Sequence, residues 1–248
     1  MIKLEKTPDG ICWMRLEDKD NNNAIGDAFC HALADIVSDI KQDKSIKVVI
    51  ITGLKDIFCS GGSEQFLQQL HQYYQQNLEH EYANYLKSLL NIPVPVIAAM
   101  EGSATGGGLT LALYCDIIIG AEQSRYGFSF MNLGFTPGMG TTALAIEAFG
   151  SFNGFEMMAT GNYPKGKTLK GKSQFNYILP KEQVIDKAIE LAQALNDKPR
   201  TALELLKKTT SIKKRQLLEH TSTIEAYMHK IAFNEPQMQQ WLTDNFTG

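Results

Sequence analysis

Two short runs of small residues have the composition of a site that stabilises negative charge as it develops on a ligand. Gly106–Gly108 follows the apolar, strand-like run Val94–Met100 and opens a segment of small and apolar residues that favours a helix. At a helix start the backbone N–H groups lack partners and the dipole is positive, so an oxygen that reaches glycine backbone is stabilised. A second turn, Cys59–Gly62, follows the strand-like run Val48–Thr52 and can supply another N–H. The sequence therefore indicates either a two-donor oxyanion site or glycines that only permit close helix–strand packing.

Four runs in this chain resemble the crotonase superfamily, the enoyl-CoA hydratases and isomerases, in order and spacing. They are VVIITG, FCSGGSE, IPVPVIAAMEGSATGGGLTLALYCDIIIG and GFTPGMG, and the resemblance spans essentially the full 248 residues. It implies an α/β crotonase fold, with a spiral of β-β-α units in residues 1–195 and a helical oligomerisation region in residues 196–248. It also implies that the backbone N–H groups of Gly62 and Gly107 hold a thioester carbonyl oxygen.

The same resemblance places Thr110 and Phe130 where hydratases of this family carry their two catalytic glutamates. Neither a threonine hydroxyl nor a phenyl group acts as a general base near neutral pH. Hydration is therefore not expected, and simple isomerisation also lacks its usual base. Without the two carboxylates the site suits a substrate that is itself an anion at the reacting end. Decarboxylation of such a substrate needs an electron sink, an apolar pocket and a proton donor.

A narrower resemblance rests on FMNLGFTPGMG and EAYMHKIAFNEPQ, which are similar to the decarboxylating crotonases of polyketide β-branching cassettes. It implies a lyase that converts a 3-methylglutaconyl group on acyl carrier protein to 3-methylcrotonyl, with no cofactor and no metal. It also implies that His229 is the catalytic histidine. The alternative is a structural histidine on a helix face, paired with Glu225 one turn back.

The contacts to the substrate are less clear from the sequence. Members of that subfamily carry a lysine in the helix after the first oxyanion glycine, whereas residues 63–86 contain neither Lys nor Arg. His71 is the nearest candidate for the carboxylate contact, and a solvated surface histidine is the alternative. The candidates for binding the acyl group are Ser63, Phe66, Leu70, Thr110 and Phe130.

Other functions remain open at this point. The chain could be another glutamate-less crotonase, such as a CoA-linked decarboxylase or a thioester hydrolase. It could also be a catalytically silent crotonase that serves as a scaffold or an RNA-binding partner. A silent scaffold would not need to keep Gly62 and Gly107, so their presence favours an enzyme.

Composition narrows the class of protein and its partners. With 44% hydrophobic residues and a net charge of −3, the chain is globular and does not attract nucleic acid through bulk charge. It contains no apolar run long enough to span a membrane and no signal-like start, so we expect a cytoplasmic protein. Four widely spaced cysteines predict reduced thiols, with neither a disulfide framework nor a zinc site.

Positive charge is concentrated in the C-terminal third. Residues 161–248 hold 14 Lys and Arg against 9 Asp and Glu. The stretch from Lys165 to Arg215 could recruit the acidic, phosphate-bearing carrier protein through Lys213, Lys214 and Arg215 in particular. An ordinary solvated face is the alternative.

Hydrophobic periodicity locates the elements that must position these residues. Period-two alternation predicts strands at residues 2–5 and 11–16 around the turn Pro8–Gly10, and Asp27 is expected to cap the helix that follows. Further strands are predicted at residues 46–52, 94–100, 116–120 and 125–128, and further helices in residues 63–90, after Gly140, and at 184–195, 202–206 and 217–233. The C-terminal helices resemble the trimerisation region of the family, which implies a trimer or a dimer of trimers.

Overall fold

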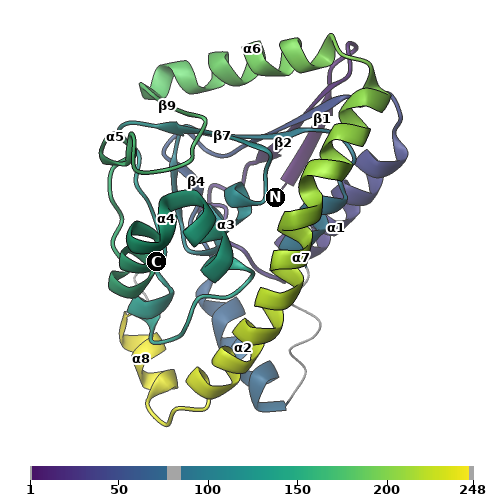
Figure 1. Ribbon diagram of the computed structural model, residues 1–248. Coiled ribbons are helices and arrows are strands. Elements are labelled where there is room, and N and C mark those ends of the chain that lie inside the picture. The colour runs from purple at the N-terminus through teal and green to yellow at the C-terminus, as the bar shows by residue number, and fades with distance from the viewer. Residues whose placement is uncertain (1, 77–84, 246–248) are drawn as a thin grey trace.

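The computed structural model describes residues 2–76 and 85–245, and its elements are arranged around two sheets (Figure 1). The larger sheet has six strands in the order β1-β2-β3-β5-β7-β9. β1 and β2 pair antiparallel, and the remaining neighbours pair parallel. Its strands are β1 (Ile2–Lys6), β2 (Ile11–Leu16), β3 (Val48–Thr52), β5 (Val96–Met100), β7 (Ile117–Ala121) and β9 (Tyr177–Leu179). The three-residue strand β9 is not evident from sequence periodicity.

A smaller parallel sheet has the order β4-β6-β8. Its strands are β4 (Ile57–Cys59), β6 (Ser103–Thr105) and β8 (Tyr126–Gly127). Three successive units each give one strand to each sheet and then a helix. They are β3-β4-α2, β5-β6-α3 and β7-β8-α4, with helices α2 (Glu64–Gln76), α3 (Gly107–Leu113) and α4 (Thr141–Thr160). The predicted spiral of β-β-α units is therefore confirmed. Each unit also brings the end of a short strand close to the start of the next helix, where both glycine turns lie.

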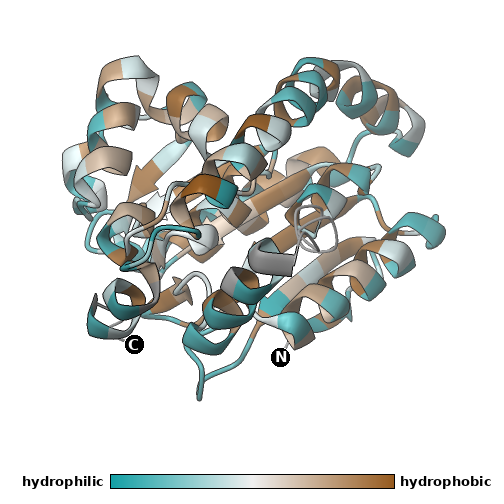
Figure 2. Ribbon diagram, turned by 90° about the horizontal axis from the view of Figure 1, so that it is seen from below, coloured by the Kyte–Doolittle hydropathy of each residue, from teal (hydrophilic) through white to brown (hydrophobic). Residues whose placement is uncertain are grey.

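The central strands are buried on both faces, as apolar runs without alternation predict for parallel strands. Val49 and Ile51 of β3 belong to the main core, whereas Val48 and Ile50 face a second cluster with α6 (Val184–Asn196). The strands in Figure 2 are accordingly mostly brown between helices whose faces alternate between brown and teal. The core therefore holds the strand ends rigidly beneath the site.

Eight α-helices are described within residues 2–76 and 85–245, together with short 3-10 turns. The remaining helices are α1 (Asp27–Gln42), α5 (Gly166–Leu169), α7 (Arg200–Ala232) and α8 (Met238–Asn245). The predicted cap of α1 is wrong, because Gly26 is the N-cap and Asp27 already lies in the first turn. The 3-10 turns are η2 (Leu86–Asn91), η3 (Phe130–Leu133) and η4 (Lys181–Gln183).

α7 is one continuous helix of 33 residues, not two separate segments at 202–206 and 217–233. The intervening residues are mostly polar or basic and carry no apolar periodicity, but Lys, Arg and Gln favour helix. The predicted boundary after residue 195 falls at the end of α6, which closes at Asn196, and the division into two domains remains a proposal. Figure 1 shows α7 running along the molecule from α6 to a lower end where it lies beside α2.

Basic side chains fasten α7 to the core. The Nζ of Lys207 lies 2.8 Å from the carboxylate of Asp116 and donates to the Val94 carbonyl at 2.9 Å. The Nζ of Lys214 donates to the carbonyl oxygens of Leu113 and Cys115, at the C-terminal end of α3. Arg215 donates to the carbonyl of Leu90 in η2. Part of the basic stretch predicted to recruit a carrier protein therefore makes contacts inside the molecule.

Two global features bear on function. No helix in the part of the chain that the structure describes is long and apolar enough to cross a membrane. Within the same residues, His, Cys, Asp and Glu form no group of three or more that could hold a metal ion. Cys12, Cys30, Cys59 and Cys115 are free and buried, and burial raises the pKa of Cys59 to about 12, so its thiol stays protonated.

Candidate active site

The two glycine turns predicted from the sequence lie against each other. The turn at Gly62 is fixed by Ile25, whose N–H donates to Gly61 at 2.7 Å and whose carbonyl accepts from Ser63 at 2.9 Å. Gly61 has a φ of +90°, and a Cβ there would lie 2.8 Å from the Thr105 oxygen and 3.4 Å from the Gly107 nitrogen. A side chain at this point would push the turns apart, which is why glycine is required.

Gly62 and Gly107 both line one cavity. α3 begins at Gly107, so this N–H belongs to the first turn, where no intrahelical acceptor exists. Outside the regular helices and strands, no described carbonyl accepts a hydrogen bond from the N–H of Gly62 or of Gly107. The lack of a described acceptor for either N–H is what an oxyanion site built from these two glycines requires, and that role stays a prediction.

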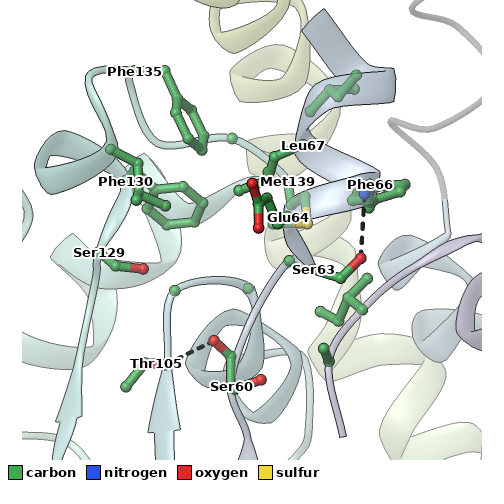
Figure 3. A pocket seen from close by; sticks show the side chains of 18 of the residues that line it. Ser60, Ser63, Glu64, Phe66, Leu67, Thr105, Ser129, Phe130, Phe135 and Met139 are labelled. Carbon is green, nitrogen blue, oxygen red and sulfur yellow. Dashed lines mark hydrogen bonds between the residues drawn. The ribbon is translucent and has the colours of Figure 1, made fainter. Parts of the chain in front are cut away.

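The cavity has a volume of about 560 Å³ and mostly apolar walls. Phe130 and Phe135 face Leu67 across it in Figure 3, and the phenyl rings of Phe130 and Phe135 pack edge to face at 5.8 Å. The charged residues in its described lining are Asp20, Glu64 and Glu225, and no described Lys or Arg lines it. The apolar lining includes Ile25, Phe66, Leu67, Leu70, Phe130, Leu133, Phe135 and Met139.

The two positions that would carry glutamates in hydratases have different roles here. Thr110 is fully buried in α3, donates to the Gly106 carbonyl at 3.1 Å and shares a 2.7 Å hydrogen bond with the hydroxyl of Thr141. It is not among the described residues that line the cavity, so its predicted contact with substrate is not supported. Phe130 does line the cavity, as predicted, and supplies an apolar wall. Neither position offers a carboxylate.

α2 supplies the wall next to Gly62. The Ser63 hydroxyl accepts from the Phe66 N–H at 3.2 Å and so caps this helix (Figure 3). Phe66 and Leu70, two of the residues predicted to bind the acyl group, line the cavity. His71 lies on α2, but its side chain is outside the described part of the structure, so its predicted contact with carboxylate stays a prediction.

His229 lines the cavity from α7 and is buried, with 6% of its surface exposed. Its Nε2 lies 2.8 Å from the Thr136 carbonyl oxygen, which can only accept, so Nε2 carries the proton of the neutral ring. Nδ1 is then the acceptor for the Tyr74 hydroxyl at 2.9 Å. The rings of Phe135 and Phe233 meet the imidazole edge to face. Both ring nitrogens are therefore engaged in hydrogen bonds within the protein.

Burial controls the protonation state of His229. It lowers the pKa of the imidazole to about 4, and the backbone carbonyls of Thr136 and Pro137 oppose this to a smaller extent. The ring is therefore neutral near pH 7. Nε2 is hydrogen-bonded to the Thr136 carbonyl. Nδ1 is therefore connected to the cavity through the hydroxyl of Tyr74, which lines it.

Tyr74 is a site residue that sequence reasoning missed. It lines the cavity together with Phe66, Leu67 and Leu70, which precede it on α2 at spacings of three to four residues. That stripe was the available signal, because residues at such spacings share one face of a helix. The partner of Tyr74 lies 155 residues further along the chain and could not be identified from spacing.

Glu225 does not pair with His229, so the predicted pairing is wrong, while the choice between a catalytic and a structural histidine stays a prediction. Its carboxylate accepts from the Gly140 N–H at 2.6 Å and from the N–H and hydroxyl of Thr142 at 2.8 and 2.7 Å. Burial raises the pKa of this carboxyl, and the hydrogen bonds from Thr142 and Gly140 oppose the rise. Glu225 thus caps the start of α4 from another helix.

Comparison with known proteins identifies the family. The family described as enoyl-CoA hydratase/isomerase matches residues 6–245. The chain belongs to this family. It is 32% identical to the bacillaene synthase decarboxylase PksI of Bacillus subtilis over 240 residues. The aligned region covers 96% of this chain and 95% of that protein.

Solved structures of the enoyl-CoA hydratase/isomerase fold agree over the whole chain. An enzyme from a dehydratase/decarboxylase couple involved in polyketide β-branching has a TM-score of 0.92 at 30% identity, covering 100% of this chain and 99% of that one. The ECH2 decarboxylase domain of CurF from Lyngbya majuscula has a TM-score of 0.87 at 28% identity and covers 99% of both chains. Members of this enoyl-CoA hydratase/isomerase family thus include decarboxylases that resemble this chain from end to end.

Proposed function

We propose that the protein decarboxylates a 3-methylglutaconyl-type thioester on acyl carrier protein and leaves a 3-methylcrotonyl-type thioester, as a step of polyketide β-branching. Similarity to PksI and to the two β-branching structures supports this choice within the family. The observation that supports the proposal most directly is the chemistry of the residues around the cavity. The oxyanion donors Gly62 and Gly107 face an apolar cavity, while Thr110 and Phe130 stand where a hydratase would need carboxylates.

The first step forms a dienolate. The thioester oxygen accepts from Gly62 and Gly107, the bond between the γ-carbon and the carboxylate breaks, and carbon dioxide leaves. The electron pair of that bond moves through the conjugated carbons onto the thioester oxygen. Each backbone donor stabilises this oxyanion by about 3 kcal/mol. The aromatic walls at Phe130 and Phe135 exclude water from the departing carboxylate, which favours its loss.

The second step adds a proton to carbon. The substrate carboxylate favours the imidazolium form of His229, because an opposite charge nearby raises a histidine pKa. The proton taken up with the substrate resides on Nδ1. It moves to the oxygen of Tyr74 while the hydroxyl proton of Tyr74 passes to the dienolate carbon. The reaction consumes one proton and returns His229 to its neutral form, so one histidine serves both as cation and as acid.

The charge at the mouth of the cavity supports a carrier-bound substrate. Asp20 and Glu64 are exposed residues of the lining and both are acidic. The several phosphate charges of CoA would be repelled there more than the single phosphodiester of a carrier arm. Lys208 and Lys213 are exposed on α7 and are available to an acidic carrier protein. We place this partnership in the cytoplasm.

Assembly into a trimer or a dimer of trimers is part of the same proposal. Phe152 and Phe155 on α4 are 90% and 67% exposed, and Tyr227 and Ile231 on α7 are 68% and 70% exposed. Large apolar side chains so exposed commonly mark a protein–protein interface. Association of subunits would remove these side chains from water.

A single experiment separates the candidate functions. The full chain is incubated with 3-methylglutaconyl carrier protein, and the intact mass of the carrier is followed. Loss of one carbon dioxide supports the proposal. Release of the free carrier thiol would indicate a thioester hydrolase, and turnover of only the CoA thioester would indicate a CoA-linked decarboxylase. An unchanged carrier and an unchanged CoA thioester would leave the scaffold alternative.

A further inference from the structure

Met139 forms the part of the cavity wall that stands directly over an oxyanion glycine. A Cβ built on Gly107 would lie 2.9 Å from the terminal methyl of Met139, so the thioether side chain touches this position. Met139 also has a φ of +59°, which is unfavourable for a residue with a side chain. Such a conformation persists only where surrounding contacts impose it.

The peptide unit that follows Met139 is held at both of its polar atoms. The Met139 carbonyl accepts from the Tyr114 hydroxyl at 2.8 Å, and the adjoining Gly140 N–H donates to Glu225 at 2.6 Å. These two contacts fix the plane of the peptide and therefore the direction in which the side chain of Met139 projects from the backbone. Tyr114 directly follows α3, whereas Glu225 reaches in from α7.

Glu225 is an unusual choice for this contact. The residue is 2% exposed, and its carboxylate binds Gly140 and Thr142 together, so it joins the end of the loop to the start of α4. Helix starts are ordinarily capped by a short polar side chain from the chain just before them. Here the cap comes from 85 residues away, on the helix that also carries His229. Helix α7 therefore carries both His229, which supplies the proton, and Glu225, which holds the wall over Gly107.

We propose that Glu225 is a positioning residue that holds Met139 over Gly107 and thereby keeps water from the dienolate. The inference rests on the proposed function, because it assigns a consequence to the intermediate of that reaction. With Met139 fixed, the proton reaches one carbon through Tyr74. With Met139 released, its positive φ relaxes, water enters beside the oxyanion, and either the α- or the γ-carbon of the dienolate can take a proton.

The test is the position of deuterium in the product formed in heavy water. Glu225→Gln keeps the size of the side chain but sets an amide NH₂ against N–H donors, so the hold on Gly140 weakens. We expect wild-type product with deuterium at one carbon. We expect Glu225→Gln to lower kcat about tenfold or more and to give two products, the 3-methylcrotonyl thioester labelled at the γ-carbon and its β,γ-unsaturated isomer labelled at the α-carbon. A purely structural role would lower thermal stability without moving the label. Glu219→Gln, an exposed carboxylate on the same helix, is the matched control.

A double-mutant cycle shows whether Glu225 acts through Met139. Met139→Gly removes the side chain and accepts the positive φ, so it should also spread the label. Adding Glu225→Gln to Met139→Gly should then change kcat and labelling little, because residues that act as one unit are not additive. Effects on kcat that multiply in the double variant would overturn the inference.

Further outcomes keep the inference separable from the reaction itself. If Glu225→Gln fails to fold, Thr142→Val removes only the hydroxyl donor, and an intermediate spread of label is expected. A folded Glu225→Gln variant with wild-type kcat and label at one carbon overturns the inference alone. Wild-type protein that releases no carbon dioxide overturns the proposed function, and the inference with it.

Discussion

The hydroxyl of Tyr74 lies 2.9 Å from Nδ1 of His229 and so connects α2 to α7 in the wall of the cavity. The phenol ring of Tyr74 stacks on Phe233 at 5.2 Å with an interplanar angle of 11°, which fixes the direction of the hydroxyl. Because Nε2 donates to the Thr136 carbonyl, Nδ1 is the acceptor in the hydrogen bond with Tyr74. The proposed proton transfer depends on this pair.

Removing the hydroxyl of Tyr74 should slow the reaction with little loss of structure. Tyr74→Phe keeps the ring packing but interrupts the route from Nδ1 to the cavity, so we expect kcat to fall about 10²-fold or more, as for a positioned acid. Decarboxylation is measured by carrier mass, and folding by circular dichroism. Tyr73→Phe on the same helix is the control, because Tyr73 does not belong to the described lining of the cavity. Wild-type kcat in Tyr74→Phe would remove Tyr74 from the route.

The buried imidazole should make stability depend on pH. The pKa of His229 is about 4 in the folded protein, whereas the usual value is 6.5. The unfolded chain therefore binds more protons between these values, and the free energy of unfolding rises with pH from about 4 to 6.5. His229→Gln should lack this part of the pH dependence, which amounts to a change of about 3 kcal/mol in the free energy of unfolding. Urea titrations at several pH values measure it, with His220→Gln as an exposed control. Parallel curves for wild type and His229→Gln would contradict the assignment.

Crotonyl thioester should not be hydrated. Water needs a general base to attack the double bond, and Thr110 is engaged with Thr141 while Phe130 carries no ionisable group. Loss of enoyl absorbance measures hydration directly. A preparation that decarboxylates the carrier substrate must be used, so that inactivity is not due to misfolding. Robust hydration would contradict the proposed function.

Acidic residues at the mouth should select against CoA. The ratio of kcat/KM for the CoA thioester to that for the uncharged pantetheine thioester should be below one and should rise with salt, because exposed charges are screened within about 10 Å at 0.1 M. Glu64→Gln should raise this ratio about threefold to tenfold at low salt. Glu17→Gln, an exposed carboxylate outside the described cavity lining, is the control. A ratio that Glu64→Gln leaves unchanged would show that the mouth does not discriminate by charge.

Assembly should depend on the exposed aromatic residues of α4. Light scattering at micromolar concentration should give three or six times the chain mass of 27.6 kDa. Phe152→Ser with Phe155→Ser should shift the protein toward the monomer, because these side chains are 90% and 67% exposed in the single chain. His220→Ser, at an exposed polar residue of α7, should leave the mass unchanged. A monomeric wild type would contradict the proposal.

Local chemistry made part of the fold predictable. The glycine turns at Gly62 and Gly107 could be located because each follows an apolar strand, and the paired donors line one cavity. The strand β3 was visible as an uninterrupted apolar run. The strand β9 was missed because three residues are too short to show a period. Asp27 was taken as a cap on residue type alone, whereas the backbone at Gly26 begins the helix.

Contacts between distant residues could not be predicted from one sequence. Tyr74 meets His229, Glu225 meets Gly140, and neither pair shows any signal in local spacing. Lys214 illustrates the same limit, because a lysine in a basic run is ordinarily solvated, yet its ammonium group binds two carbonyl oxygens at the end of α3. Such partners become known only when the fold brings the segments together.

The continuous helix α7 has a consequence for the order in which the protein matures. The strands and α3 are complete once residue 179 has been synthesised, but His229 and Glu225 belong to a helix that ends at Ala232. While a chain emerges from the ribosome, its sheets can form with the glycine turns in place and with one wall still missing. Substrate that met such a nascent chain would find oxyanion donors open to water and no acid. The enzyme therefore becomes competent only after α7 has been synthesised and has docked on the sheets.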